Sequence, residues 1–126
     1  MKKFFVIISG SRDFNDYNLL KRKCNQYLEE KRKTHEIVIV SGNARGADKL
    51  GEKYANEEGF QLEIYKADWD KYGKCAGYKR NEQMAEVGDA VIAFWDEVSK
   101  GTKHMIDIMK EKNKLVRTIK YNETSY

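Results

Sequence analysis

Residues 3–14 read Lys-Phe-Phe-Val-Ile-Ile-Ser-Gly-Ser-Arg-Asp-Phe, an apolar run followed by a polar loop. The run from Phe4 to Ile8 is unbroken and has the length of a strand, which is typical of a strand covered on both faces. Gly10 and the charged residues after it mark the end of that strand. These residues therefore predict a buried strand whose carboxyl end opens into a polar loop.

Apolar runs of the same kind recur at Ile37–Val40 and Ala90–Trp95, whereas Leu62–Lys66 and Leu115–Lys120 include polar residues. Unbroken runs are typical of interior strands, and mixed runs are typical of edge strands. Segments with apolar residues spaced by three and four separate the runs and predict amphipathic helices. The predicted strands are Lys3–Ser9, Glu36–Ser41, Gln61–Ala67, Asp89–Trp95 and Leu115–Tyr121. The predicted helices lie near Asp16–Lys33, Ala47–Glu58, Gly77–Val87 and Thr102–Lys112.

Strict alternation of strands and helices predicts a parallel sheet with helices on both faces. With strands one, two and four in the interior and strands three and five at the edges, the strand order is 3-2-1-4-5. The predicted fold class is therefore α/β: a single Rossmann-like, three-layer domain with a five-stranded parallel sheet. We expect this domain to span residues 1–121 and residues 122–126 to form a short tail.

The composition excludes several classes of protein. The chain has 126 residues and a formal net charge of +4, and none of its apolar runs approaches the ~20 residues that cross a bilayer. The run at the N-terminus is shorter than the ~7 to 15 residues of a signal-peptide core, so we expect a cytoplasmic protein. Cys24 and Cys75 are too few for a disulfide framework and lack the partners of a zinc site, so no metal site is predicted.

Ligands of such sheets bind beyond the carboxyl ends of the strands, where the strand order reverses. Three loops fall there, and each contains glycine and a cation and leads into a helix N-terminus. Exposed amides and the helix dipole at such a position favour an anion, most often phosphate. The predicted phosphate-binding residues in these loops are Gly10, Ser11, Arg12, Asp13, Gly42, Ala44, Arg45, Gly46, Asp48, Ser99, Lys100, Gly101 and Thr102.

Arginine usage supports this prediction. Arg12, Arg45 and Arg80 are three of only six arginines in a chain with 24 basic residues. The guanidinium group grips phosphate oxygens through two bonds, which lysine cannot do. The alternative is that Arg12 and Arg45 pair with Asp13 or Asp48 and that the acids only cap helices.

A fourth stretch, residues 68–81, is long for a connection and must cross the same region of the sheet. Trp69 and Tyr72 are candidates for stacking on a nucleobase, or they plug the end of the sheet. We expect Trp95, at the end of strand four, to form a further wall for the base. Lys74, Arg80 and Asn81 are candidates for contacts with phosphate or ribose.

Together these motifs resemble the SLOG superfamily, the fold shared by DprA and the Lonely guy proteins, and especially its YspA-like branch. The resemblance covers nearly the whole chain and rests on residues 10–14, 44–48, 72–81 and 92–102. It implies a Rossmann-like domain that binds nucleotides or nucleotide-derived molecules, often as a homodimer or a larger homo-oligomer. Related domains are associated with NAD or ADP-ribose metabolism, with sensing and with conflict between phages and bacteria.

One departure from the Lonely guy phosphoribohydrolases concerns catalysis. Arg80 resembles the arginine of their signature, but the position of their glutamate, three residues after Gly101-Thr102, is Met105. Methionine cannot carry charge or relay a proton. The resemblance therefore implies that phosphate binding is retained and that hydrolysis by that mechanism is not.

Three functions follow as hypotheses. The first is a sensor or sequestering protein that binds an ADP-ribose, NAD or cyclic-nucleotide type of ligand and requires no other cofactor. The second is a nucleosidase or phosphoribohydrolase, for which the nearest candidate groups are Asp13, Asp48, Glu82, Asp96 and His104. The third is DprA-like binding of single-stranded DNA, which we rank last because acidic residues interrupt the lysines.

Overall fold

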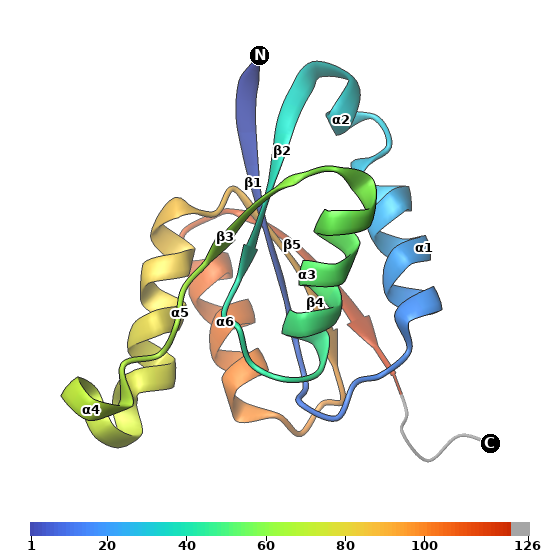
Figure 1. The fold of residues 1–126 in the computed structure, drawn as a ribbon. Helices are drawn as coiled ribbons and strands as arrows, with labels where there is room; N and C mark the ends of the chain where they lie inside the picture. The colour runs from blue at the N-terminus through green and yellow to red at the C-terminus, as the bar shows by residue number, and fades with distance from the viewer. Residues whose placement is uncertain (122–126) are drawn as a thin grey trace.

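The computed structural model describes residues 1–121, so the predicted tail, 122–126, lies outside the described residues. The strands are β1 (Lys2–Gly10), β2 (His35–Ser41), β3 (Gln61–Ile64), β4 (Ala90–Trp95) and β5 (Leu115–Lys120). The helices are α1 (Tyr17–Leu28), α2 (Lys31–Thr34), α3 (Ala47–Glu58), α4 (Trp69–Tyr72), α5 (Ala76–Val87) and α6 (Lys100–Glu111), with a short 3-10 turn at Gly73–Cys75. Figure 1 shows these elements along the chain.

The five strands form one parallel sheet of order β3-β2-β1-β4-β5, as the sequence predicts. The central strand β1 pairs with β2 on one side, where Val6 lies opposite Ile39, and with β4 on the other, where Ile8 lies opposite Ile92. Both neighbours run in the same direction as β1, so the carboxyl ends of all three strands meet at one edge of the sheet.

Helices cover both faces of the sheet (Figure 1). Because successive strand residues point to opposite faces, Val6 and Ile8 join the core cluster under α1 and α3, while Ile7 joins the cluster under α5 and α6. Both clusters are formed by side chains with almost no exposed surface. The two hydrophobic layers fix the sheet between the helix pairs and thereby hold its carboxyl edge in place.

Several element boundaries differ from the predicted ones. The first helix ends at Leu28, the last residue of its apolar stripe, because the charged residues that follow form the separate helix α2, which buries no side chain. Strand β3 ends at Ile64 instead of Ala67, since its partner β2 ends at Ser41, opposite Ile64. Helix α6 begins at Lys100 instead of Thr102 because Ser99 caps it. Within residues 1–121, none of the helices has the length and apolar character needed to cross a membrane.

Candidate functional site

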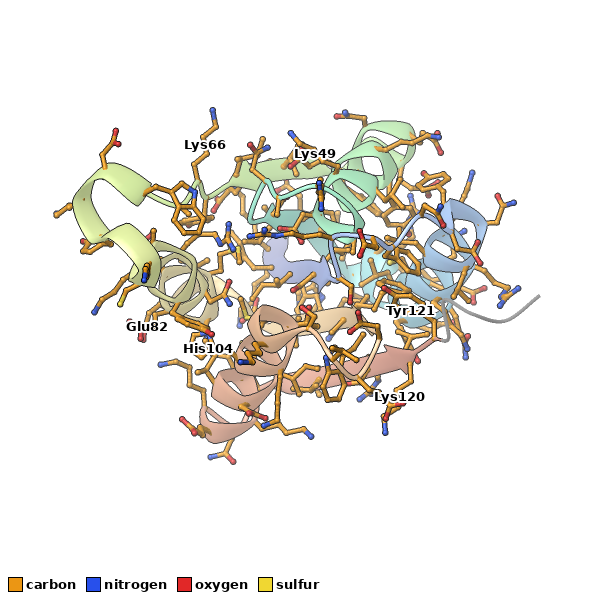
Figure 2. All side chains as sticks on the ribbon, turned by 90° about the horizontal axis from the view of Figure 1, so that it is seen from below. Lys49, Lys66, Glu82, His104, Lys120 and Tyr121 are labelled. Atoms are coloured by element: carbon orange, nitrogen blue, oxygen red, sulfur yellow. The ribbon has the colours of Figure 1, made fainter. Side chains whose placement is uncertain are left out.

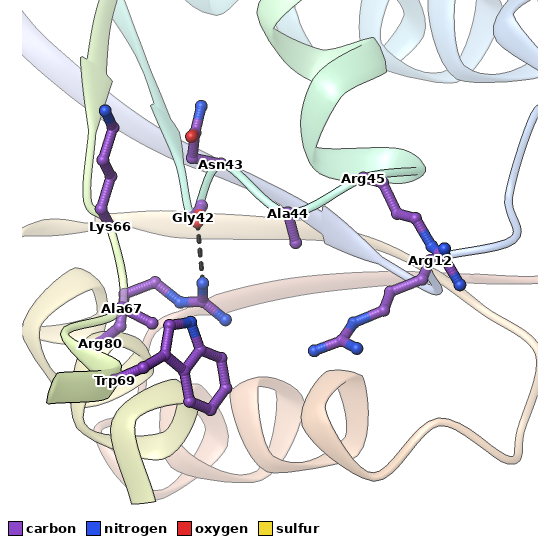
Figure 3. A pocket seen from close by; sticks show the side chains of 9 residues that line it. All are labelled: Arg12, Gly42, Asn43, Ala44, Arg45, Lys66, Ala67, Trp69 and Arg80. Carbon is purple, nitrogen blue, oxygen red and sulfur yellow. Dashed lines mark hydrogen bonds between the residues drawn. The ribbon is translucent and has the colours of Figure 1, made fainter. Parts of the chain in front are cut away.

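Two adjoining pockets lie at the carboxyl edge of the sheet, which Figure 2 views end on. The first has a volume of about 500 Å³, and we call it the cationic pocket. It is lined by Arg12, Gly42, Asn43, Ala44, Arg45, Lys66, Ala67, Trp69 and Arg80 (Figure 3). The second has a volume of about 350 Å³, and we call it the carboxylate pocket. It is lined by Ser9, Gly10, Ser11, Arg12, Asp13, Ala44, Asp48, Arg80, Asn81, Met84, Asp96, Val98, Ser99, Gly101 and Thr102.

The loops after β1 and β2 are held together by backbone contacts. The amide of Ala47, the first residue of α3, donates to the carbonyl oxygen of Ser11 at 3.3 Å. Gly46 permits this approach because its φ is +81° and a Cβ there would clash with the carbonyl oxygens of Ser11 and Arg12. Gly10 is equally confined, since a Cβ would clash with the carbonyl oxygen of Phe94. These two glycines therefore allow close packing of protein against protein, and Gly10 also lines the carboxylate pocket.

Arg80 lies where the two pockets meet. Its Nη1 donates to the carbonyl oxygen of Gly42 at 2.8 Å, and its Nε donates to the Asn81 side chain at 3.4 Å. Burial lowers the pKa of the guanidinium, and the nearby Asp48 carboxylate opposes that shift. Helix α5 begins at Ala76, so Arg80 lies in its second turn.

Asp48 is buried in the first turn of α3, with 5% of its surface exposed. Its Oδ2 accepts a hydrogen bond of 3.2 Å from the amide of Ala44. Burial raises the pKa of Asp48 to about 6, although that hydrogen bond and the Arg80 guanidinium act in the opposite direction. The chain thus keeps a buried carboxylate beside two arginines, Arg12 and Arg80, at the wall of the carboxylate pocket.

The loop after β4 satisfies much of its own hydrogen bonding. Asp96 accepts from the amides of Val98 and Ser99 at 2.9 and 2.8 Å, and the side chain of Ser99 caps α6. Burial raises the pKa of Asp96, but these amides and the Ser11 hydroxyl outweigh that effect, so the pKa is lowered. The buried Asn81 side chain donates to the carbonyl oxygen of Gly101 at 3.2 Å and so ties α5 to α6.

The predicted aromatic walls fall in different places. Trp69 is half exposed and lines the cationic pocket, where its ring lies beside the guanidinium group of Arg80 and faces that of Arg12 across the pocket (Figure 3). Tyr72 lines a separate, smaller pocket with Lys71 and Lys79. Trp95 packs on the core cluster under α5 and α6 and donates from its indole nitrogen to the carbonyl oxygen of Ser99 at 3.0 Å. The structure thus brings Trp69 to the predicted site and places Trp95 outside both pockets, contrary to its predicted role as a wall.

Of the other cations predicted to bind phosphate, the arginines line a pocket and the lysines do not. Arg12 makes no hydrogen bond or ion pair with any other residue in the described range 1–121, and Arg45 makes only a long contact of 3.9 Å with the exposed Asp13. The alternative of pairing with aspartate is therefore met by Arg45, through a long and exposed ion pair, and not by Arg12. Lys74 and Lys100 are exposed and line neither of the two pockets.

Of the catalytic candidates, Asp13, Asp48 and Asp96 line the carboxylate pocket, whereas Glu82 and His104 line neither of the two pockets. Glu82 is exposed on the outer side of α5 (Figure 2). His104 lies within 3.2 Å of the Asn81 amide and against the ring of Tyr78, and burial lowers its pKa. Met105 is fully buried in the core under α5 and α6, so its position presents no side chain to either pocket. Among residues 1–121, histidine, cysteine, aspartate and glutamate side chains form no group of three suited to hold a metal ion.

Sequence reasoning missed Lys66, Ala67 and Asn43, which line the cationic pocket. The Lys66 side chain lies at the rim of the pocket (Figure 3). It had been placed inside strand three, whereas β3 ends at Ile64 and Lys66 follows the carboxyl end of the strand. The rule that ligands bind at carboxyl ends would have identified it, had the strand boundary been correct.

A parallel 3-2-1-4-5 sheet with helices on both faces defines a Rossmann-like α/β domain, and the carboxylate pocket lies beyond β1 and β4, where the strand order reverses. Residues 4–72 match the model of one family in this class, described as the YspA, cpYpsA-related SLOG family. The chain belongs to this family, as the sequence resemblance implied. Membership in a SLOG family indicates binding of a nucleotide-related ligand or a related function.

Individual relatives agree with this assignment. The Gene 61 protein of Mycobacterium phage D29 is 37% identical over 105 residues, which cover 79% of this chain and 82% of that protein. The crystal structure of DNA processing protein A (DprA) from Streptococcus pneumoniae superposes with a TM-score of 0.73 at 20% identity. The alignment covers 98% of this chain but 52% of DprA, so this chain spans about half the length of DprA. TM1055, a structural genomics target, superposes with a TM-score of 0.61 at 20% identity over 92% of this chain and 72% of TM1055. These two structures share the fold.

Proposed function

We propose that the protein binds a phosphate-bearing, nucleotide-derived small molecule at the carboxyl edge of its sheet and holds it intact, as a sensor or a sequestering protein. The observation that carries this proposal is the cationic pocket. Four cations line it, Arg12, Arg45, Lys66 and Arg80, and none of its lining residues is acidic. A phosphate group is the anion that guanidinium groups bind best, because each can donate two parallel hydrogen bonds.

The arrangement of Trp69 supports a nucleotide rather than a free phosphate. Its ring is half exposed and borders the same space as the two guanidinium groups (Figure 3). An aromatic face beside cations accommodates a nucleobase joined to phosphate, and such stacking contributes about 1 to 3 kcal/mol per base. The volume of about 500 Å³ lies within the range of pockets that bind small molecules.

The test is native mass spectrometry and titration calorimetry of the full chain with ADP-ribose, NAD, cyclic ADP-ribose, AMP and a short DNA strand. We expect one adenine nucleotide to bind per chain, and Arg12→Ala and Arg45→Ala each to weaken it by about tenfold, since each removes a charge-assisted hydrogen bond. Arg22→Ala is the matched control, because Arg22 is an exposed arginine of α1 that lines neither pocket. The proposal would be contradicted if the wild type and the three variants bound the nucleotide with equal affinity, or if the wild type bound only DNA.

Asp48 favours a second candidate, hydrolysis of the bond between base and ribose. A buried carboxylate whose pKa is raised to about 6 can hold or release a proton near neutral pH, as an acid or base in such a reaction requires. The same nucleotide samples are therefore analysed for free nicotinamide and free adenine. Release of base that is lost in Asp48→Asn supports this second candidate, and unchanged nucleotide supports the first.

A further inference from the structure

The two pockets differ sharply in charge although they share a wall. Arg12, Ala44 and Arg80 line both of them. On the side of Trp69 the lining is cationic, whereas on the other side three carboxylates appear, those of Asp13, Asp48 and Asp96. A ligand that occupies both pockets therefore meets an aromatic ring, then arginines, then carboxylates, in that order.

Hydrogen bonds from backbone amides hold two of the three aspartates of the carboxylate pocket in place. Asp48 is held through Oδ2 by the amide of Ala44, and Asp96 is held through Oδ1 by the amides of Val98 and Ser99. Neither carboxylate forms an ion pair with the described residues, 1–121. Both carboxylates line the carboxylate pocket and are not neutralised by direct contact with a cation of the described residues.

Apart from the two arginines of the shared wall, Arg12 and Arg80, and a few apolar and glycine positions, the rest of the lining is polar and uncharged. It includes the hydroxyl groups of Ser11, Ser99 and Thr102 and the amide of Asn81. Ionised carboxylates only accept hydrogen bonds, and hydroxyl groups both donate and accept. Such a lining suits a group that carries several hydroxyl donors. Beyond the shared wall, where Arg12 and Arg80 lie, it does not suit a phosphate group, which has no donor when ionised and is repelled by the three carboxylates.

We propose that the carboxylate pocket is a sugar subsite, so that the ligand is a nucleoside diphosphate whose far phosphate carries a second sugar with free hydroxyl groups. This inference rests on the proposed function, because it takes the phosphates to lie against Arg12 and Arg80 and the base against Trp69. The phosphates then lie at the shared wall, and the second sugar extends beyond it to donate hydroxyl hydrogen bonds to Asp48.

Three probes with the same adenosine diphosphate core test this arrangement by calorimetry: ADP, ADP-ribose and ATP. We expect ADP-ribose to bind about tenfold more tightly than ADP, since a hydroxyl bonded to a buried carboxylate is a charge-assisted hydrogen bond. We expect ATP to bind no more tightly than ADP, because its third phosphate would face the carboxylates.

The variant Asp48→Asn separates this subsite from the phosphate site. Its amide oxygen can still accept from Ala44, while the negative charge is removed. We expect the ratio of ADP-ribose to ADP affinity to fall from about ten toward one, with ADP itself bound more tightly. A variant that failed to fold would lose ADP as well, so the two effects are distinguishable. Asp107→Asn is the matched control and should keep the original ratio, because Asp107 lies on α6, lines neither pocket and pairs with Lys103.

The outcomes distinguish the subsite from the function it rests on. If ADP and ADP-ribose bind equally and both depend on Arg80, the sugar subsite is wrong and the phosphate site stands. If ATP binds most tightly, the carboxylate pocket is an anion site and the inference is overturned. If none of the three probes binds, the proposed function fails together with the inference.

Discussion

The guanidinium group of Arg80 donates a hydrogen bond of 2.8 Å to the carbonyl oxygen of Gly42, 38 residues earlier in the chain. This bond connects α5, on one side of the sheet, to the loop after β2. It leaves the second terminal nitrogen of the guanidinium group beside the cationic pocket, where Figure 3 shows it next to Trp69. Arg80 therefore has two roles, since it links two elements and supplies positive charge to the pocket.

The first prediction separates these roles. Arg80→Lys keeps a positive charge but loses the planar donor group, and Arg80→Ala loses both. We expect the free energy of unfolding to fall by about 1 kcal/mol in both variants, because the Gly42 carbonyl loses its partner. Affinity for ADP-ribose should fall more in Arg80→Ala than in Arg80→Lys. Urea unfolding and calorimetry measure the two quantities. Lys79→Ala, the exposed neighbour on α5, is the control, and equal affinities for both Arg80 variants would argue against a role for the charge.

The second prediction concerns stacking on Trp69. The chain has two tryptophans, so Trp95→Phe leaves Trp69 as the single indole fluorophore. We expect adenine nucleotides to quench the fluorescence of that variant, because a stacked base contacts the ring directly. Trp69→Ala should weaken binding by about 1 to 3 kcal/mol, and Trp69→Phe by less. If Trp95 alone responds to the ligand, the base lies elsewhere.

The third prediction concerns the dependence of stability on pH. Burial raises the pKa of Asp48 to about 6 from its ordinary value of 3.8, while Arg80 and Arg12 lower it and Glu52 raises it. The folded protein therefore holds this proton more tightly than the unfolded chain does. The stabilisation from Asp48 is present below pH 4 and is lost as the pH rises through about 6.

Asp48→Asn removes this dependence. We expect the variant to be more stable than the wild type at pH 7.5, by at most about 3 kcal/mol, with the difference shrinking toward pH 4. Urea unfolding of both proteins at pH 7.5, 6 and 4.5 gives the difference directly. A variant that is less stable than the wild type at pH 7.5 would mean that the arginines more than compensate the buried charge.

The fourth prediction compares two glycines of the site. Gly46 has a φ of +81° and no room for a Cβ beside Ser11, so Gly46→Ala should lower the free energy of unfolding by about 1 to 3 kcal/mol. Gly101 lies in the first turn of α6, and a Cβ there would meet no atom within 4 Å. Gly101→Ala should therefore raise the free energy of unfolding by about 0.5 to 1 kcal/mol. Thermal unfolding measures both changes, and a loss of stability in Gly101→Ala would contradict the open space around it.

The fold could be predicted because its signals are local and repeated. Unbroken apolar runs such as Phe4–Ile8 and strict alternation with helices leave few topologies, and 3-2-1-4-5 was among them. The end of β3 was misplaced because Tyr65, Lys66 and Ala67 continue its pattern, while the strand ends where β2 no longer offers a partner. Strand length there depends on a neighbour, which the sequence of β3 does not contain.

The position of the two pockets was predicted in outline, and the arrangement of their side chains was not. Loop composition brought Arg12, Arg45, Asp48 and Arg80 together, and the structure places all four at the two pockets. The orientation of Trp95 could not be read from composition, since the alternation of β4 turns that side chain toward the core under α5 and α6. The separation of cations and carboxylates into two pockets could not be predicted from the sequence either. Each loop contains both basic and acidic residues, and only the three-dimensional arrangement shows which pocket each residue lines.

The contact between Ser11 and Asp96 joins residues 85 positions apart in the chain. Such a contact forms only after β4 has added to β1, which requires closing a loop longer than half the protein. Any partly folded form that lacks β4 therefore lacks one wall of the carboxylate pocket. A ligand bound across both pockets recognises the finished sheet alone, so its binding free energy adds in full to the stability of the native state.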